Sequence, residues 1–429
     1  MLLIAFSIVI SIAAGSIAQG MQLRYLAVVL LFVGFWVFYA LFYGVTLHNT
    51  LPFIGLYFIK PLELGFYLMM GLLLLLGLIE LLRKGELKLL IHYPLATCVL
   101  LCFGVISATK INVPMGYSYF FSTIITPLLV LYLFGNAVIR QNTMYLWMQV
   151  IVAVASFVGL YGVVIAVRNP LDRLGSFWVT AMTINGFYTV AFFFALTLAL
   201  HHKSGWKQTF YAVATIIIFF GMIYTYTRMA ILAVAFGIFL FMLKLRVMRY
   251  IGFGFLLLIP LVIPSSMVSR IQMGFSYDIS LVIRAIAWYL SVVQIMKHPF
   301  TGMGFSVWST WYPKVIPLRI LYAQHSHNVY LNQMVEMGIF GTAAYFYIVW
   351  NVMHRFWKNC VQRSADILFF GMWVAMMALL FACITDIFIQ QYSISILFWI
   401  SLGLMLACSN QWQPVSQKHT ETINKETDE

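Results

Sequence analysis

Two arginines and one histidine combine residue types that suit chemistry on a pyrophosphate-like anion. Arg228 ends the sequence Thr-Tyr-Thr-Arg at the junction of two apolar runs, and Arg284 stands at the head of a weakly amphipathic segment. His327 lies in the sequence His-Ser-His-Asn-Val-Tyr-Leu, residues 325–331. The planar guanidinium group of arginine stays charged and pairs with phosphate oxygens through two hydrogen bonds. An imidazole has a pKa near neutrality, so His327 is a candidate general base.

Each of these residues also has a structural interpretation. An arginine at a membrane boundary is commonly an interfacial anchor, and a lone histidine in a loop is commonly polar surface. Glu336 follows His327 by nine residues, which places the two on opposite sides of a straight helix and favours a structural role for this carboxylate. Asp278 and Asp172 are weaker candidates for orienting the imidazole. Secondary candidates for contacts with a donor or an acceptor are Arg270, Lys314, Arg319, Asn328 and Tyr330.

Motifs for metal ions and nucleotides are missing from the sequence. The segment 265–338 has no Asp-x-Asp pair, and no group of histidines or carboxylates has the spacing of metal ligands. The sequence also lacks a phosphate-binding Gly-Lys-Ser/Thr loop. We therefore expect no cofactor, no metal ion and no nucleic-acid partner.

Apolar helices must position the candidate residues. Of the 429 residues, 63% are hydrophobic and 9% are charged, whereas an ordinary soluble domain has about 25% charged residues. This composition excludes a soluble enzyme. Thirteen apolar runs are long enough to cross a bilayer, and some of them are short. The sequence therefore predicts an all-α, multi-pass bundle of about 12 transmembrane helices embedded among membrane lipids.

One long interruption divides this bundle. We expect transmembrane helices over 1–264, a large loop over 265–338, three C-terminal transmembrane helices over 339–408, and a disordered cytoplasmic tail over 409–429. Basic clusters in alternate links place those links in the cytoplasm and the large loop on the opposite side. The side on which the N-terminus lies stays open. Within the loop, the spacing predicts a helix over 281–297 and another from near Ser326 toward Met337.

Several short motifs in this region resemble the O-antigen ligase and O-antigen polymerase superfamily. They are Arg284 with Trp288, the sequence His-Pro-Phe-Thr-Gly-Met-Gly at 298–304, His-Asn-x-Tyr-Leu at 327–331, and Glu-x-Gly-x-x-Gly at 336–341. The sequence Thr-x-Thr-Arg at 225–228 is similar to the family's Ser-x-Ser-Arg element, with threonine in place of both serines. The resemblance covers about 220–345.

The resemblance implies a metal-independent glycosyltransferase of the bacterial inner membrane, with a glycosyltransferase type C-like fold and a periplasmic active site. The ligase branch moves O-antigen glycan from undecaprenyl pyrophosphate to lipid A–core during lipopolysaccharide assembly. His327 would be the general base and Arg228 and Arg284 would hold the pyrophosphate. Direct displacement would invert the anomeric carbon.

Three other functions stay open at this point. An O-antigen or exopolysaccharide polymerase of the same superfamily has the same chemistry with a growing glycan as acceptor. A flippase or transporter of lipid-linked oligosaccharide would need charges along a mid-membrane cavity and two similar halves, and the sequence has neither. A membrane scaffold would leave the arginines and the histidine unexplained.

Overall fold

The computed structural model describes residues 47–59, 90–111, 113–137, 141–168, 178, 180–250, 252–254, 279–364 and 366–411. The chain divides into two compact units, Met1–Lys88 and Leu89–Glu429. In the first unit the described residues form α3 (Leu47–Tyr57). Several predictions fall outside the described residues: those for the apolar runs before residue 47, for Asp172, Arg270 and Asp278, and for the polar tail.

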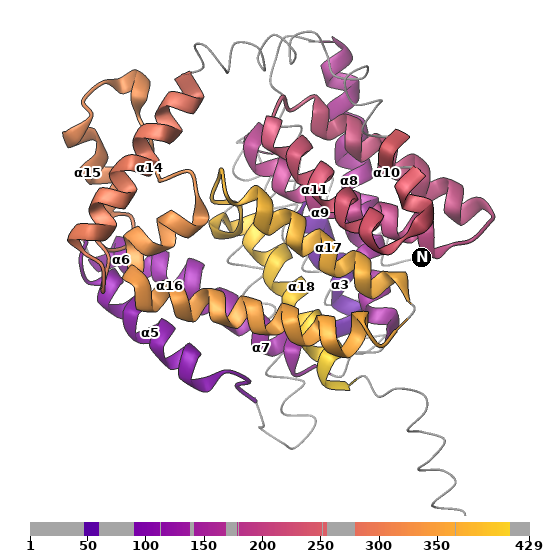
Figure 1. Cartoon of the computed structure of the whole chain (residues 1–429), viewed down its shortest axis with the longest axis horizontal. Coiled ribbons are helices and arrows are strands. Elements are labelled where there is room, and N and C mark those ends of the chain that lie inside the picture. The colour runs from indigo at the N-terminus through magenta and orange to yellow at the C-terminus, as the bar shows by residue number, and fades with distance from the viewer. Residues whose placement is uncertain are drawn as a thin grey trace, which may run out of the picture. The chain divides into compact units, whose positions relative to one another are not determined.

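The second unit is built from helices (Figure 1). They are α5 (Pro94–Ala108), α6 (Val113–Phe120), α7 (Thr126–Gly135), α8 (Gln141–Arg168), α9 (Ala181–His201), α10 (Trp206–Ile223), α11 (Arg228–Lys244), α14 (Ile279–Lys297), α15 (Val307–Val315), α16 (Val329–Phe356), α17 (Ile367–Ala382) and α18 (Tyr392–Gln411). Shorter π and 3-10 segments are η1 (Phe121–Ile125), η2 (Arg319–Leu321), η3 (Trp357–Val361) and η4 (Phe388–Gln390). No described residue belongs to a β-strand, so the all-α prediction is confirmed.

Six helices in the described ranges are long and apolar enough to cross a membrane: Met115–Gly135, Asn142–Ala166, Ala181–His201, Trp206–Ile223, Ile279–Lys297 and Tyr392–Gln411. Two shorter apolar helices are Pro94–Ala108 and Ile367–Ala382. Large apolar side chains such as Leu160 and Ile216 are exposed on the outer surfaces of these helices. Such surfaces are unfavourable in water and suit contact with lipid. The structure thus supports a membrane protein, while the count of twelve helices stays a prediction.

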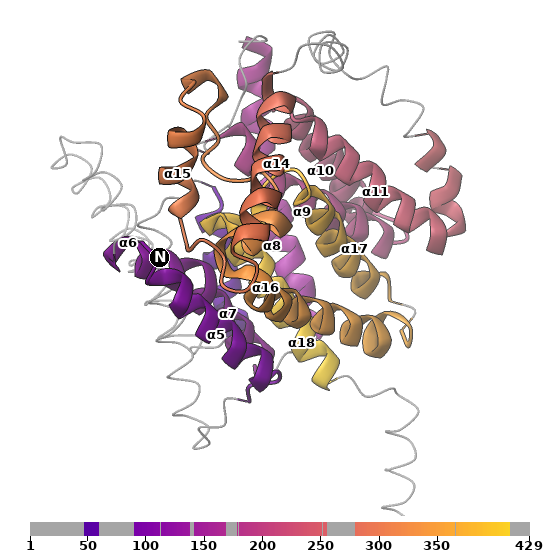
Figure 2. The same cartoon turned by 60° about the vertical axis from the view of Figure 1, so that its left-hand side comes forward.

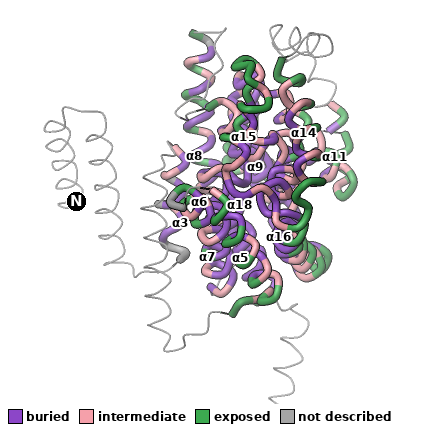
Figure 3. The backbone as a smooth tube through the Cα atoms, turned by 90° about the vertical axis from the view of Figure 1, so that its left-hand side faces the viewer, coloured by how far each residue is buried: buried purple, intermediate pink, exposed green. Residues whose placement is uncertain are grey.

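The core of the bundle lies around α9 and α18. Within these two helices, 83% and 94% of the most apolar window is buried, and Figure 3 shows both in the buried colour. A helix that is apolar on every side is buried by other helices rather than by water. Two of their buried hydroxyl groups are satisfied within the helix, because Thr197 and Ser401 donate to carbonyls one turn earlier at 2.6 and 2.7 Å.

Helix α14 packs against α16, and α15 stands beside α14 (Figure 1 and Figure 2). A small apolar cluster joins them, with Ala287 from α14, Trp308 and Tyr312 from α15, and Val335 from α16. The sequence predicted a helix over 281–297 and a second one from near Ser326; α14 covers the first range, and α16 begins at Val329, three residues after the predicted start. This cluster fixes the start of α14 relative to the start of α16.

A kink in α16 explains the glycines of two motifs. At Gly338 the helix has a φ of +69°, and a Cβ there would lie 2.3 Å from the backbone of Phe300. The opened turn frees the carbonyl groups of Val335 and Glu336. The Val335 carbonyl accepts from Met303 N at 2.6 Å, and the Glu336 carbonyl accepts from Gly304 N at 3.2 Å. Only glycine adopts this conformation without strain. The segment after α14 is therefore locked to α16, two to three turns beyond His327.

Candidate functional site

His327 lies directly before the N-cap of α16, in a backbone conformation that few residues adopt. Its φ is +50°, in the left-handed region, where a residue other than glycine is strained. Asn328 caps the helix, because its Oδ1 accepts from the N–H groups of Tyr330 at 2.9 Å and Leu331 at 3.1 Å. The indole N–H of Trp288 on α14 donates to the His327 carbonyl at 3.4 Å. These contacts fix the direction in which the imidazole leaves the backbone.

Asp386 is the carboxylate that faces this imidazole. It follows α17, and its Oδ1 lies 3.9 Å from His327 Nδ1. The end of α17 is tied to the start of α16, since Val329 N donates to Cys383 O at 3.0 Å. A separation of 3.9 Å exceeds a hydrogen bond, and the buried Nδ1 of His327 has no hydrogen-bond partner among the described residues. Asp386 is thus an electrostatic partner that a small movement would bring into hydrogen-bond range.

A second imidazole lies against the first. The ring centroids of His325 and His327 are 4.3 Å apart, and His327 N donates to His325 Nδ1 at 3.2 Å. Since Nδ1 of His325 accepts this bond, its proton is assigned to Nε2 when the ring is neutral. His325 therefore stiffens the strained backbone at His327 and brings a further titratable group to the site.

Burial and charge keep both imidazoles neutral. Burial lowers the pKa of His325 to about 4, and the positive charge of Arg284 acts in the same direction. Burial also lowers the pKa of His327 to about 4; His325 and Arg284 add to this effect, and Asp386 opposes it. Burial raises the pKa of Asp386, which the charges of His327 and Arg284 partly offset. At neutral pH both rings are in the form that accepts a proton.

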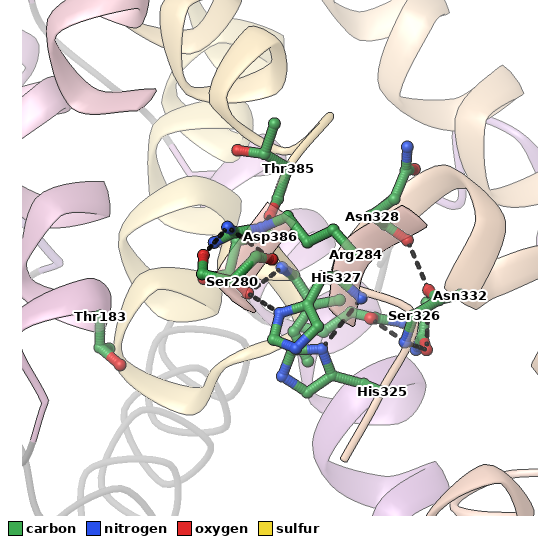
Figure 4. Close-up of polar contacts among 12 residues, drawn as sticks. Thr183, Ser280, Arg284, His325, Ser326, His327, Asn328, Asn332, Thr385 and Asp386 are labelled. Atoms are coloured by element: carbon green, nitrogen blue, oxygen red, sulfur yellow. Dashed lines mark hydrogen bonds and ion pairs between the residues drawn. The ribbon is translucent and has the colours of Figure 1, made fainter. Parts of the chain in front are cut away.

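Arg284 reaches the same place from α14. Its Nε donates to the Thr385 carbonyl at 3.3 Å, directly before Asp386, and its Nη1 donates to the carbonyl and hydroxyl oxygens of Ser280 one turn earlier. Figure 4 shows Arg284, His327 and Asp386 gathered where α14, the start of α16 and the link after α17 meet. Two of the three residues predicted for chemistry, Arg284 and His327, are therefore neighbours.

Arg228 lies at the same end of the bundle. It begins α11 and follows Tyr226, which is buried and has a φ of +54°. The turn is tied to the start of α9, because Asn185 Nδ2 donates to Thr225 Oγ1 at 2.6 Å. The next residue of α9, Gly186, packs so tightly that an added Cβ would lie 3.0 Å from the Phe388 ring, just after Asp386. A second strained residue thus occurs in a motif singled out by sequence, and α9 connects that motif to the Asp386 link.

Of the secondary candidates, Asn328 and Tyr330 contact other helical segments, whereas Lys314 and Arg319 are exposed. Asn328 serves as the helix cap, and the hydroxyl of Tyr330 donates to the Leu380 carbonyl at 2.9 Å. Both side chains are thereby engaged in holding α16. Lys314 and Arg319 are exposed, at the end of α15 and in η2.

Sequence reasoning missed two members of this group. Asp386 is not among the carboxylates chosen from the sequence, and His325 enters the sequence analysis only as the first residue of the motif at 325–331. The available signal for Asp386 was its position as a carboxylate between two strongly apolar helices, where an ionisable residue is costly. Its partner comes from a distant segment, so no local spacing reveals the pair. Glu336, predicted to be structural, is buried and accepts from Gln390 Nε2 at 3.4 Å.

His325, His327 and Asp386 also have the residue types of a metal site. Their potential ligand atoms all lie within 4.8 Å of one another. Local spacing did not predict this group, because the fold supplies the carboxylate from another segment. The neighbouring guanidinium of Arg284 acts on all three residues, and a positive charge there repels a cation. The electrostatics of the group therefore favour an anion beside Arg284.

These features define a multi-helix membrane protein in which a half-buried histidine, a buried aspartate and an arginine meet where several helices end. The family model described as O-antigen ligase matches residues 213–346, a range that contains Arg228, Arg284 and His327. The match confirms the resemblance to the O-antigen ligase superfamily, which is enzymatic, over this part of the chain. None of the curated proteins matches this chain in sequence.

Proposed function

We propose that this protein is a periplasm-facing glycosyltransferase of the bacterial inner membrane. It transfers O-antigen glycan from undecaprenyl pyrophosphate to lipid A–core. The observation that carries the proposal is the meeting of Arg284 and His327 with Asp386, at 3.9 Å between His327 Nδ1 and Asp386 Oδ1. The family match supplies the reaction class. Lipid-linked substrates reach such a site laterally from the membrane.

The reaction proposed is a single displacement. Nε2 of His327 takes the proton of the acceptor hydroxyl, since Nδ1 faces Asp386. The hydroxyl oxygen forms a bond to the anomeric carbon as the bond from that carbon to the pyrophosphate oxygen breaks, which inverts the carbon. Undecaprenyl pyrophosphate leaves with the bonding electrons, and Arg284 and Arg228 stabilise its developing charge. The carboxylate of Asp386 stabilises the imidazolium that forms at His327.

Donor binding would also strengthen the base. With a pKa of about 4, the resting imidazole of His327 is a weak proton acceptor. One of the groups that lower its pKa is Arg284, whose charge a bound pyrophosphate would neutralise. Neutralising this charge would raise the pKa of His327 in part, while burial, the largest cause of its lowering, remains. The site thus couples occupation by the anionic donor to readiness for proton transfer.

The test uses purified protein, lipid-linked donor and lipid A–core acceptor, with a gel readout of transferred glycan. His327→Ala should abolish detectable transfer. The matched control is His354→Ala, because His354 is an exposed histidine in the last turn of the same helix. If His327→Ala turns over as the wild type does, the general-base assignment is wrong.

A deletion strain separates the ligase from the polymerase. Loss of a ligase leaves lipid A–core with no O-antigen, whereas loss of a polymerase leaves core carrying a single repeat unit. Complementation with wild type and with His327→Ala then ties the pattern to the site. A single-repeat band would replace the ligase proposal with the polymerase.

A further inference from the structure

A buried hydrogen bond joins the two segments that carry His327 and Asp386. Asn332, in the first turns of α16, donates from Nδ2 to Oε1 of Gln390 in η4 at 2.9 Å. Asn332 is 1% exposed and Gln390 is 7% exposed, so water does not compete for this bond. Each amide follows its site residue by about one turn of chain. The bond therefore joins the same two chain segments as the His327–Asp386 pair.

The side-chain oxygen of Asn332 binds Ser326, the residue before His327. Asn332 Oδ1 accepts from Ser326 N at 3.3 Å, and the Ser326 hydroxyl lies 3.3 Å from the same oxygen. Ser326 is fully buried. On the far side, Gln390 Nε2 donates to Glu336 Oε2 at 3.4 Å. A continuous line of hydrogen bonds thus runs from the strained turn at His327 to the link after Asp386.

Packing alone does not require these amides. Burying an amide has a desolvation cost that its hydrogen bonds only offset, and apolar side chains of similar volume fill such a space equally well. What an apolar pair cannot do is set one separation between two segments, because its contacts have no direction. A paired amide fixes both distance and angle.

On this basis, and resting on the proposed function, we infer that Asn332 and Gln390 are positioning residues for glycan transfer. Their hydrogen bond sets the separation between the imidazole of His327 and the carboxylate of Asp386. Coulomb attraction falls with distance, so at an effective dielectric constant of about 20 a separation about 1.5 Å longer than 3.9 Å would slow the step about sevenfold for two unit charges, and about threefold if half of the charge has developed on the imidazole. The cross-link acts on the rate through Asp386 and not on substrate binding.

A double-mutant cycle tests this inference. Asn332→Leu keeps the volume of the side chain and removes the bond; it should lower kcat about three- to sevenfold and leave KM for donor and acceptor unchanged. In an Asp386→Asn background the same substitution should have no further effect, because the attraction that it weakens is already lost. Additive losses, or an unchanged kcat for Asn332→Leu, would overturn the inference.

Two controls keep the result interpretable. Ser401→Ala removes another buried hydrogen bond, from Trp147 Nε1 at 3.1 Å, far from the site along the helices, and should leave kcat unchanged. If Asn332→Leu does not give a monodisperse protein, Gln390→Met replaces it in the cycle, because this substitution removes the same hydrogen bond at its acceptor. The parallel His327→Ala assay separates the two proposals. If that variant is fully active the proposed function fails, and if it is inactive while the cycle is additive only the positioning role fails.

Discussion

Replacing Asp386 by asparagine should slow glycan transfer strongly while leaving the protein folded. The substitution keeps the shape of the side chain and removes its negative charge. Asp386 is buried, and its Oδ1 lies 3.9 Å from Nδ1 of His327. In the proposed reaction His327 becomes an imidazolium, and Asp386 is the nearest described carboxylate that could stabilise it.

The size of the effect follows from this distance. Two unit charges about 4 Å apart attract by about 4 kcal/mol at an effective dielectric constant of about 20. If only half of the charge has developed on the imidazole in the transition state, the loss is about 2 kcal/mol. Each 1.36 kcal/mol is a factor of ten in rate, so kcat should fall by between about 30-fold and about 1000-fold.

The assay is single-turnover transfer with purified protein in nanodiscs, at saturating donor and acceptor. The control is Asp366→Asn, since Asp366 lies 3.5 Å from His201 at the opposite end of α17 and forms an equivalent His–Asp contact. Asparagine is as good a helix cap as aspartate, so this variant should behave as wild type. A rate for Asp386→Asn within threefold of the control would refute the electrostatic role.

Three further predictions concern other parts of the site. Arg284→Lys should lower kcat/KM by about 10- to 100-fold in the same assay, because losing the guanidinium fork removes about 1–3 kcal/mol of charge-assisted hydrogen bonding; an unchanged value would contradict pyrophosphate binding there. Gly338→Ala should reduce stability by about 1–3 kcal/mol, seen as a lower Tm in detergent, because its φ is +69° and a Cβ would meet Phe300 at 2.3 Å. The free energy of unfolding should fall as pH drops from about 6.5 to about 4, because His325 and His327 have folded-state pKa values near 4 and the unfolded chain takes up their protons first. The raised pKa values of Asp386 and Glu336 act in the opposite direction, so the Tm of the wild type is compared with that of a His325→Gln, His327→Gln double variant, and an equal change in both proteins would argue against the burial of the two imidazoles.

The helices of the second unit could be predicted from the sequence because hydropathy is a local property. Three of the thirteen apolar runs of the sequence, at 91–109, 178–200 and 389–408, correspond to α5, α9 and α18. The helix predicted over 281–297 ends where α14 ends, at Lys297, and the helix predicted from near Ser326 begins three residues later, at Val329 after the Asn328 cap. In each case the determining interaction lies within one or two turns of chain.

The composition of the site could be predicted only in part. Arg284 and His327 were chosen from residue type and motif, and the fold makes them neighbours. Asp386 was passed over, because its significance depends on Val329 and Cys383 joining two helix ends that are distant in sequence. A contact of that kind has no periodicity and no spacing rule, so it emerges only from the packed structure.

Neighbouring residues within one motif also differ in whether a local or a distant contact determines their role. In the sequence His-Asn-x-Tyr-Leu, only His327 faces Asp386, whereas Asn328 caps α16 and Tyr330 bonds the end of α17. The cap fixes where the helix begins, and the residue directly before it is forced into the left-handed conformation that aims the imidazole. Asn332 then ties this turn to the link that carries the carboxylate. The motif therefore specifies a backbone geometry as much as a reactive group, which is why its single histidine occurs together with residues that touch no reacting atom.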